Sequence, residues 1–488
     1  MRQYDGSNMP LDRNVKAPIR FLTVATRPGF TALLLVFSDL ATLLASGVLA
    51  AGLRHLPDGE FSPAAYVQLW PVALLFVLVC ALVGLYPGVG LAPAEELRRL
   101  TLATTLVYLV LGAGTFLLKE GDAYSRAVFL GAWAFSVVLV PLGRALMRHL
   151  FAKKKWWGYP VVVLGAGKTG RMVVRALLRQ PGLGLKPVAV LDDDPEKHGT
   201  LEGVPVVGGV ELAPVLAREL GIRHAIVAMP GVPRARLLEL LEEYGGVFPH
   251  LFLIPDLFGF SSLWVSARDL GRVLGLEVRQ QLLLPLPRVI KRAIDLFLTV
   301  VGGLAVLPFI GLIALLIKLD SPGQVFYVQE RLGRDGRLFK AVKFRTMYGD
   351  GEARLAKLLE QDPALREEYE LYHKLRNDPR VTRVGRILRK FSLDELPQLW
   401  NVLKGEMSLV GPRAYLPREL PKMAGSERII LKVHPGITGL WQVSGRSEVP
   451  FKERLELDTY YVRNWSIWLD LYILARTVWV VLFGKGAY

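Results

Sequence analysis

The chain has few of the residues that most often bind metals or form covalent cross-links. Its 488 residues include one cysteine, Cys80, and seven histidines. A single cysteine excludes a disulfide scaffold and any zinc or iron–sulfur site built from cysteines. The histidines are scattered, with no pair at metal-ligand spacing. Neither residue type therefore marks a metal centre.

Charged residues are scarce for a protein of this size, at 21% of the chain, whereas 52% of the residues are hydrophobic. The mean hydropathy of +0.33 is too apolar for an ordinary soluble protein, yet the charge is too high for a bundle that lies wholly in a membrane. We therefore expect membrane and globular domains in one chain. The net charge of +16 suits an anionic membrane surface, phosphorylated substrates or nucleic acid, and composition alone does not choose among them.

No apolar run occurs before Phe30, and residues 1–29 carry several charges. These residues do not resemble a cleavable signal peptide, and we interpret them as a cytoplasmic N-terminal leader. Four apolar segments follow, each long enough to cross ~30 Å of hydrocarbon. They span residues 30–51, 67–85, 100–118 and 127–147. We predict a four-helix transmembrane bundle over residues 30–150.

Basic residues indicate which side of the membrane the loops of this bundle face. Lysine and arginine precede the first segment, lie between the second and third, and follow the fourth; Arg13, Arg98 and Lys153 are examples. Because basic loops stay in the cytoplasm, we expect both ends of the bundle there. Asp39 lies within the first segment, where an ionisable group is often functional. The alternative, which we favour, is a carboxylate that is hydrogen-bonded inside the bundle.

Apolar strands and helices alternate from Tyr159 to Asp256. This order predicts a Rossmann-like α/β module over residues 159–256, followed by a linker over residues 257–287. The expected strands are 161–164, 188–191, 225–229 and 251–254, and the expected helices are 171–179 and 233–244.

A glycine-rich turn joins the first strand and helix of this module. Gly165 would allow the tight turn, Gly167 would let the backbone approach a pyrophosphate, and Gly170 would permit close packing of the helix. Asp192 could bind a ribose hydroxyl of a dinucleotide such as NAD. The alternative, which we favour, is a module kept for dimerisation or regulation. Sugar-nucleotide dehydratases and epimerases usually need a Tyr-x-x-x-Lys pair, which occurs nowhere in this chain.

A fifth apolar segment, 296–317, has 22 residues without a charge and is interrupted by Gly302, Gly303 and Pro308. Basic residues flank both of its ends, so both flanks are expected in the cytoplasm. The segment would enter the inner leaflet, bend where Pro308 removes a backbone donor, and return to the same side. We therefore predict a re-entrant membrane helix over residues 288–319. A kinked helix that crosses the membrane is the alternative.

The last apolar stretch, 465–483, is rich in tryptophan, tyrosine and leucine but contains Asp470 and Arg476. This composition predicts an interfacial C-terminal helix over residues 465–488. A buried helix of a soluble domain is the alternative.

Residues 320–464 form a basic globular segment that contains two adjacent carboxylates, Asp394 and Glu395. Pro397 is tolerated only in the first turn of a helix, so a helix is expected to begin close to Asp394. Neighbouring side chains at a helix start point about 100° apart, so one carboxylate can attack phosphorus while the other holds a metal. The alternative is structural, because Ser392 and Glu395 fit a capping box and Asp394 alone would be a good N-cap.

Four motifs of this segment resemble the bacterial sugar transferase family of polyprenyl-phosphate phosphoglycosyl transferases. The motifs cover residues 343–347, 377–385, 394–413 and 434–439. The resemblance runs from about Pro287 to the C-terminus. The preceding membrane segments and α/β module are similar to those of large members of the family. A re-entrant helix also precedes the catalytic segment in that family.

The resemblance implies a role for each of five residues. Asp394 would be the nucleophile and Glu395 a Mg²⁺ ligand. Arg389, Arg413 and Lys343 would bind phosphate. The chain departs from the family pattern in three places that leave the two carboxylates intact, at Leu307, at Lys390 with Phe391, and at Ala414.

The resemblance implies transfer of a hexose-1-phosphate from a UDP-hexose to undecaprenyl phosphate, with release of UMP, at the start of lipid-linked polysaccharide synthesis. The fold class would be a membrane protein with a four-helix transmembrane bundle, a Rossmann-like α/β module and a monotopic α/β catalytic domain. We expect the bacterial inner membrane, a catalytic domain facing the cytoplasm, contact with membrane lipid, a homodimer and no nucleic acid. Two alternatives are a membrane-bound NAD-dependent sugar-nucleotide oxidoreductase and a non-enzymatic scaffold for glycan assembly.

Overall fold

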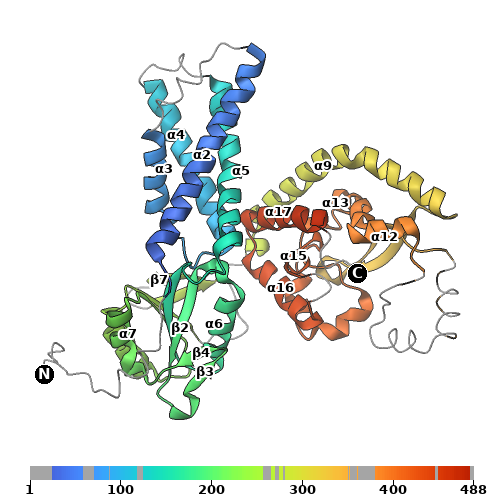
Figure 1. Cartoon of the computed structure of the whole chain (residues 1–488). Coiled ribbons are helices and arrows are strands. Elements are labelled where there is room, and N and C mark those ends of the chain that lie inside the picture. The colour runs from blue at the N-terminus through green and yellow to red at the C-terminus, as the bar shows by residue number, and fades with distance from the viewer. Residues whose placement is uncertain are drawn as a thin grey trace, which may run out of the picture. The chain divides into compact units, whose positions relative to one another are not determined.

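The computed structural model divides into two compact units, Met1–Leu257 and Phe258–Tyr488 (Figure 1). The residues that it describes are 25–58, 71–86, 88–117, 125–255, 265–269, 274–278, 281–349, 380–445 and 449–483, with the single positions 351, 355, 360 and 378.

Four helices lie where the four spans are predicted. They are α2 (Pro28–Asp58), α3 (Pro71–Leu82), α4 (Pro93–Leu117) and α5 (Arg126–Phe151). Three of them, α2, α4 and α5, are long and apolar enough to cross a membrane. Helix α3 has 12 residues, which reach only about 18 Å at the helical rise per residue. Residues 67–70 of the second predicted span lie outside the described residues.

An ion pair lies in the interior of this bundle. Asp39 on α2 accepts hydrogen bonds from Nε and Nη2 of Arg144 on α5, at 2.9 and 2.5 Å. The two side chains are 0% and 1% exposed. Arg144 also donates to Glu96 at 3.2 Å, and the Tyr86 hydroxyl donates to Asp39 at 2.5 Å. Asp39 therefore has the structural role that we favoured, because hydrogen bonds from two partners offset the cost of burying its charge.

A six-stranded sheet follows the bundle, with strand order β3-β4-β2-β1-β5-β6 and a single antiparallel pair, β3 with β4. Its strands are β1 (Tyr159–Leu164), β2 (Leu185–Leu191), β3 (Gly199–Leu201), β4 (Val204–Val206), β5 (His224–Val227) and β6 (His250–Leu253), and its helices are α6 (Lys168–Arg179), α7 (Ala213–Leu220) and α8 (Arg234–Gly245). The predicted alternation of strands and helices is present. Strands β3 and β4 were missed because three residues show no periodicity.

The segment predicted as a linker, 257–287, contains regular structure. The strands β7 (Val265–Asp269) and β8 (Leu274–Val278) form an antiparallel pair, and the 3-10 turn η6 (Gln281–Leu283) follows. The sequence did not predict these elements. The two strands stabilise each other by pairing. The sequence contains no long apolar run at these positions that would predict them.

Helix α9 (Pro285–Asp320) is a single helix of 36 residues with Pro308 in its interior. A straight helix of this length would measure about 54 Å, well beyond a hydrocarbon core of about 30 Å. Figure 1 shows α9 as a bent ribbon. Most of its apolar side chains are exposed, as Phe297, Leu304 and Leu319 are at 66%, 68% and 74%. The bend and the apolar surface are compatible with a re-entrant helix, and its path through a membrane stays a prediction.

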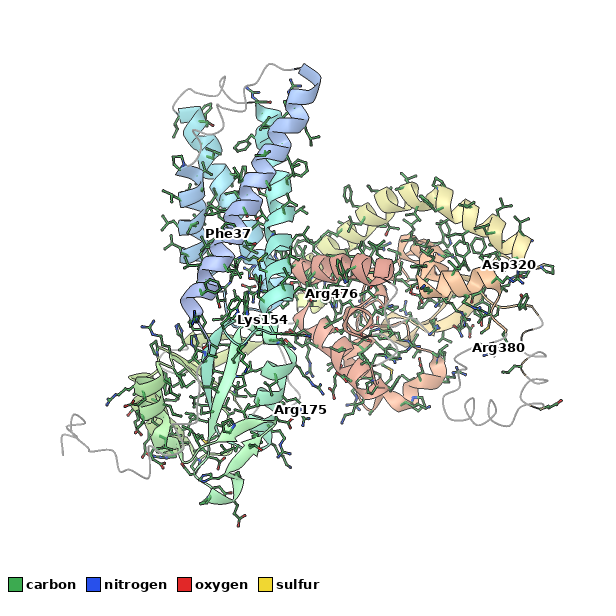
Figure 2. The ribbon with its side chains drawn as sticks, in the orientation of Figure 1. Phe37, Lys154, Arg175, Asp320, Arg380 and Arg476 are labelled. Carbon is green, nitrogen blue, oxygen red and sulfur yellow. The ribbon has the colours of Figure 1, made fainter. Side chains whose placement is uncertain are left out.

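Small sheets and short helices make up the remainder of the second unit. Strands β9 (Phe326–Leu332) and β10 (Leu338–Phe344) pair antiparallel, and β11 (Ser408–Val410) pairs parallel with β12 (Gly436–Thr438). The helical elements are η7 (Arg334–Gly336), α12 (Arg383–Lys390), η8 (Leu393–Gln398), α13 (Leu399–Lys404), η9 (Pro417–Met423), α14 (Glu427–Ile430), α15 (Leu440–Ser444), α16 (Phe451–Asn464) and α17 (Ile467–Phe483). Asp320, which is labelled in Figure 2, lies at the end of α9. Its carboxylate accepts the backbone N–H of Val384 in the first turn of α12 at 3.0 Å. Together with Thr382 Oγ1, which accepts the N–H of Gly385 at 2.9 Å, this bond caps the start of α12.

The C-terminal helix α17 is partly buried and partly exposed. Asp470 near its start is buried and accepts hydrogen bonds from Lys291 of α9 and Tyr461 of α16, both at 2.7 Å. Val478 and Trp479 near its end are 60% and 56% exposed. The first turns are therefore packed in the protein, whereas the last turns present the apolar side chains that an interfacial helix needs.

Candidate active site

The two adjacent carboxylates lie in a tight turn between α12 and α13. Ser392 has a φ of +54°, which is a left-handed backbone conformation. Residues other than glycine rarely adopt it. The 3-10 turn η8 begins at Leu393 and contains Pro397. A helical turn therefore begins next to Asp394, as predicted. The capping-box interpretation was wrong, because the Ser392 side chain makes no capping hydrogen bond in this conformation.

Lys343 brings a positive charge to this turn from strand β10. Its Nζ lies 2.6 Å from Oε1 of Glu395. The two side chains are 21% and 27% exposed, so the pair is partly shielded from water. The strand β9–β10 pairing holds Lys343 opposite Tyr327. A strand and a turn that are distant in the sequence thus form one charged site.

Asp394 lies in the same group of charges. Burial raises the pKa of this carboxyl well above its usual range. The positive charges of Lys343 and Arg389 oppose that rise, whereas the neighbouring Glu395 adds to it. The site therefore contains two carboxylates and two cations in a poorly hydrated place, where electrostatic interactions are strong.

Arg389 is held beside this turn by its contact with Thr346. Its Nε donates to Thr346 Oγ1 at 2.9 Å. Close packing makes this contact possible: a Cβ added at Gly385, in the same helix α12, would overlap the carbonyl oxygen of Thr346. Glycine at this position therefore allows α12 to lie against the chain that follows β10.

Arg413 has its own set of contacts. Its backbone N–H donates to Asp458 Oδ2 at 3.0 Å, and its guanidinium lies 3.6 Å from Glu419. The guanidinium also lies over the rings of Tyr415 and Trp441, at 5.8 and 5.6 Å from their centroids. These contacts orient Arg413, and the interactions described for it do not include the two carboxylates.

Arg331 on β9 connects this second group with the first. Burial and the charge of Arg413 lower the pKa of its guanidinium, whereas Glu419 and Glu395 raise it. Nη1 of Arg331 also donates to the carbonyl oxygen of Ala414, the residue after Arg413, at 2.9 Å. The sequence predicted no role in this site for Arg331, because its place opposite Phe339 of β10 follows only from the pairing of the two strands.

The donor set at Glu395 fits magnesium. Proteins usually hold Mg²⁺ with one or two carboxylates together with substrate phosphates and water. The carboxylate of Glu395 already lies against a cation, the ammonium of Lys343. Among the described residues, no cluster of three or more His, Cys, Asp or Glu side chains is suited to a metal held by protein alone. Glu395 is the residue that would hold a Mg²⁺ here, together with substrate phosphates and water.

The glycine-rich turn lies in the other unit. Gly165 has φ +107°, and a Cβ there would lie 2.5 Å from Met229 Cγ. A Cβ at Gly170 would overlap the carbonyl oxygen of Gly165, whereas nothing lies within 4 Å of a Cβ at Gly167. Two of the glycines are therefore needed by the fold, and Gly167 leaves open space beside the turn.

Asp192 binds this turn directly. Its carboxylate accepts the N–H of Ala166 at 2.7 Å, the N–H of Asp194 at 3.0 Å and the ammonium of Lys197 at 3.2 Å. Burial raises the pKa of Asp192, but these donors outweigh burial and hold the pKa below its usual range. The carboxylate thus has a structural role in the turn, and the binding of NAD or another nucleotide stays a prediction.

Two family models match the chain. A model described as bacterial sugar transferase matches residues 286–484, and a model described as a CoA-binding domain matches residues 81–255. The first match contains all five residues to which the sequence resemblance gives a role.

Relatives match over most of their own length. UDP-galactose-lipid carrier transferase of Erwinia amylovora is 36% identical over 395 residues, which are 79% of this chain and 81% of the relative. Undecaprenyl-phosphate galactose phosphotransferase of Salmonella typhimurium is 36% identical over 75% of this chain and 77% of its own. UDP-glucose:undecaprenyl-phosphate glucose-1-phosphate transferase of Escherichia coli is 33% identical over 74% and 77%.

These matches extend across both units, and two of the sugar transferase motifs meet where Lys343 contacts Glu395. The chain therefore belongs to the bacterial sugar transferase family, and it is a membrane-bound phosphoglycosyl transferase.

Proposed function

We propose that the protein transfers a hexose-1-phosphate from a UDP-hexose to undecaprenyl phosphate and releases UMP. The names of the relatives supply the two substrates. The observation that carries the chemistry is the location of Asp394 and Glu395 in one turn with Lys343 and Arg389 beside them. A carboxylate needs no general base to attack phosphorus, provided that cations neutralise the phosphate it approaches.

In the first step, a carboxylate oxygen of Asp394 attacks the β-phosphorus of the UDP-hexose. The bond between this phosphorus and the bridging oxygen breaks, and UMP leaves with the electron pair. A hexose-phosphoryl group is then attached to Asp394. Lys343, Arg389 and Arg413 bind phosphate oxygens and stabilise the charge that develops on them.

Glu395 would hold Mg²⁺, which neutralises charge on the diphosphate when it is bound. In the second step, a phosphate oxygen of undecaprenyl phosphate attacks the same phosphorus. The bond to Asp394 breaks, and the carboxylate is regenerated together with the lipid-linked sugar. Each step is a single displacement at phosphorus, so no hydride or redox cofactor is required.

The test is an incubation of membrane-embedded protein with single UDP-hexoses, Mg²⁺ and no lipid acceptor. UDP-galactose and UDP-glucose are both tried, because the two sugars differ at one hydroxyl. Wild-type protein should release at most one equivalent of UMP and gain the mass of a hexose phosphate on the peptide that contains Asp394. Asp394→Asn should give neither product.

Glu395→Gln serves as the comparison variant, since it keeps the nucleophile and removes the proposed metal ligand. We expect a slow release of UMP that still yields the adduct. UMP release that strictly requires both substrates, with no adduct on any peptide, would contradict the proposed intermediate.

We further propose that both ends of α9 face the cytoplasm, in the inner membrane of a bacterium. Lys318 and Leu284 are exposed near the two ends of the helix, and the single native cysteine, Cys80, is buried. Lys318→Cys and Leu284→Cys can therefore be labelled with little background. Both should react only after a thiol reagent is admitted to the cytoplasm. Labelling of Lys318→Cys from outside intact cells would contradict a re-entrant helix.

A further inference from the structure

A cavity of ≈ 540 Å³ lies beside the first turns of α9 in the C-terminal unit. Its wall is formed by α9, by the turn that follows α13 and by residues 432–434, with Arg334 contributed by η7. None of the five residues placed in the transfer reaction is among the described residues that line it. The cavity is therefore a separate feature of the unit.

The cavity wall is strongly basic. Five of its residues carry a positive charge, and among the described lining residues Asp295 is the only acid. The basic residues are Arg288, Lys291, Arg292, Arg334 and Lys432.

Two of the five cations have an acidic partner in the protein, and Arg334 lies 3.4 Å from Asp335. Lys291 pairs with Asp470 at 2.7 Å. Arg288 donates to the carbonyl oxygen of Leu282, and Arg292 donates to the carbonyl oxygens that end α13. Carbonyl oxygens satisfy hydrogen bonds but carry no net charge. The guanidinium groups of Arg288 and Arg292 therefore leave the cavity with an excess of positive charge.

The pKa of His434, which also lines the cavity, is affected by these positive charges. Burial lowers the pKa of its imidazole, and the nearby Arg334 and Arg292 lower it further. Two arginines from different elements thus act on one point of the cavity wall. An anion bound there would be attracted by both, and guanidinium groups are well suited to phosphate oxygens.

The remaining surface of the cavity is apolar and continues onto the exposed side of α9. Val289, Leu296 and Met407 line the cavity. Val289 is 65% exposed and Leu286, on the preceding turn, is 67% exposed. A basic pocket at the end of a long apolar helix has the character of a headgroup site, where an anion and a hydrocarbon chain are bound together.

We propose that this cavity binds the phosphate of an anionic lipid, whose hydrocarbon chain lies along the exposed apolar side of α9. The phosphate can come from a bulk phospholipid such as phosphatidylglycerol or from a polyprenyl phosphate. Both have the same chemistry at the site, namely a phosphate on an apolar tail. Binding of such a lipid does not depend on the transfer reaction.

The experiment is native mass spectrometry of the full chain, released from micelles that contain equal amounts of phosphatidylglycerol and phosphatidylcholine. Wild-type protein should retain more phosphatidylglycerol than phosphatidylcholine. Arg288→Gln combined with Lys432→Gln should weaken this preference about fivefold for each cation removed, the equivalent of ~1 kcal/mol for one basic residue near an anionic headgroup. Lys422→Gln, an exposed lysine outside the cavity lining, should behave as wild type.

Undecaprenyl phosphate is then added as a competitor. Displacement of phosphatidylglycerol from the wild-type protein by an equimolar amount would identify a polyprenyl phosphate as the ligand, and retention would identify a bulk phospholipid. Either result supports the lipid-phosphate site. A double variant that is folded, as judged by its thermal unfolding, and that keeps the full preference for phosphatidylglycerol would overturn it.

Discussion

Nζ of Lys343 lies 2.6 Å from Oε1 of Glu395, although the two residues are 52 positions apart in the chain. Lys343 comes from a strand and Glu395 from a 3-10 turn. Their contact places an ammonium beside both carboxylates of the active site. The local charge balance, and with it the ability to accept a phosphate, depends on how β10 packs against η8.

Lys343→Gln should lower the rate of UMP release about 100-fold, which corresponds to ~2.7 kcal/mol of barrier. The variant removes the cation that acts on both carboxylates, so an incoming diphosphate meets a more negative site. Initial rates in nanodiscs would measure the effect. Lys343→Arg should retain part of the activity, and Lys340→Gln, an exposed lysine on the same strand, should keep the wild-type rate. A Lys343→Gln variant with the wild-type rate would remove Lys343 from the mechanism.

Gly385→Ala should destabilise the protein and reduce transfer. A Cβ at this position overlaps the carbonyl oxygen of Thr346, so α12 must move away from the chain that holds Arg389 in place. Overpacking of this kind costs about 1–3 kcal/mol. The thermal unfolding midpoint and the transfer rate should fall together. Gly349→Ala is the matched control, because nothing lies within 4 Å of its added Cβ.

Asp458 should make stability depend on pH. This carboxyl is fully buried, and burial raises its pKa to about 7, despite hydrogen bonds from Tyr415 and from the backbone of Arg413. A raised pKa means that the folded state binds the proton more tightly than the unfolded state does. The stability that the proton confers is therefore complete below about pH 4, the unfolded pKa, and is lost as the pH rises through 7, by up to about 4 kcal/mol.

Asn resembles the protonated carboxyl group but does not titrate. Asp458→Asn should therefore remove the part of the pH dependence of stability that comes from Asp458. We expect the thermal unfolding midpoint of the wild-type protein to fall between pH 5 and pH 8 by more than that of Asp458→Asn. Glu456→Gln changes an exposed carboxylate on the same helix and should leave the wild-type difference intact. An identical pH dependence in wild type and Asp458→Asn would show that Asp458 titrates normally.

Two glycine variants should separate the folding of the α/β module from any nucleotide chemistry. Gly170→Ala should unfold the module, because its Cβ overlaps the carbonyl oxygen of Gly165. Gly167→Ala and Asp192→Ala should leave intrinsic transfer within about tenfold of the wild-type rate, or ~1.4 kcal/mol. Rates are normalised to folded protein and measured with and without NAD. A collapse of transfer in Gly167→Ala, with a rate in the wild type that depends on NAD, would assign this module to catalysis.

Local patterns in the sequence were sufficient for the apolar helices and for the alternating strands and helices. An apolar run or an alternating pattern is formed by residues that are close together in the sequence. It can therefore be recognised without knowing how the chain folds around it. The helical turn at Asp394 was predictable for the same reason, because Pro397 restricts the backbone on its own. The strands β7 and β8 were missed since their stability comes from pairing with each other.

The partners of the charged residues were decided by tertiary structure. Asp39 meets Arg144 across 105 residues, and Arg413 meets Asp458 across 45. Lys343 was expected to bind phosphate, but its contact with Glu395 follows only from the packing of β10. No periodicity or spacing in the sequence predicts which distant charged residues will pair. Their positions follow from how helices and strands pack, and the free energy of burying each charge is favourable only when that packing supplies its partner.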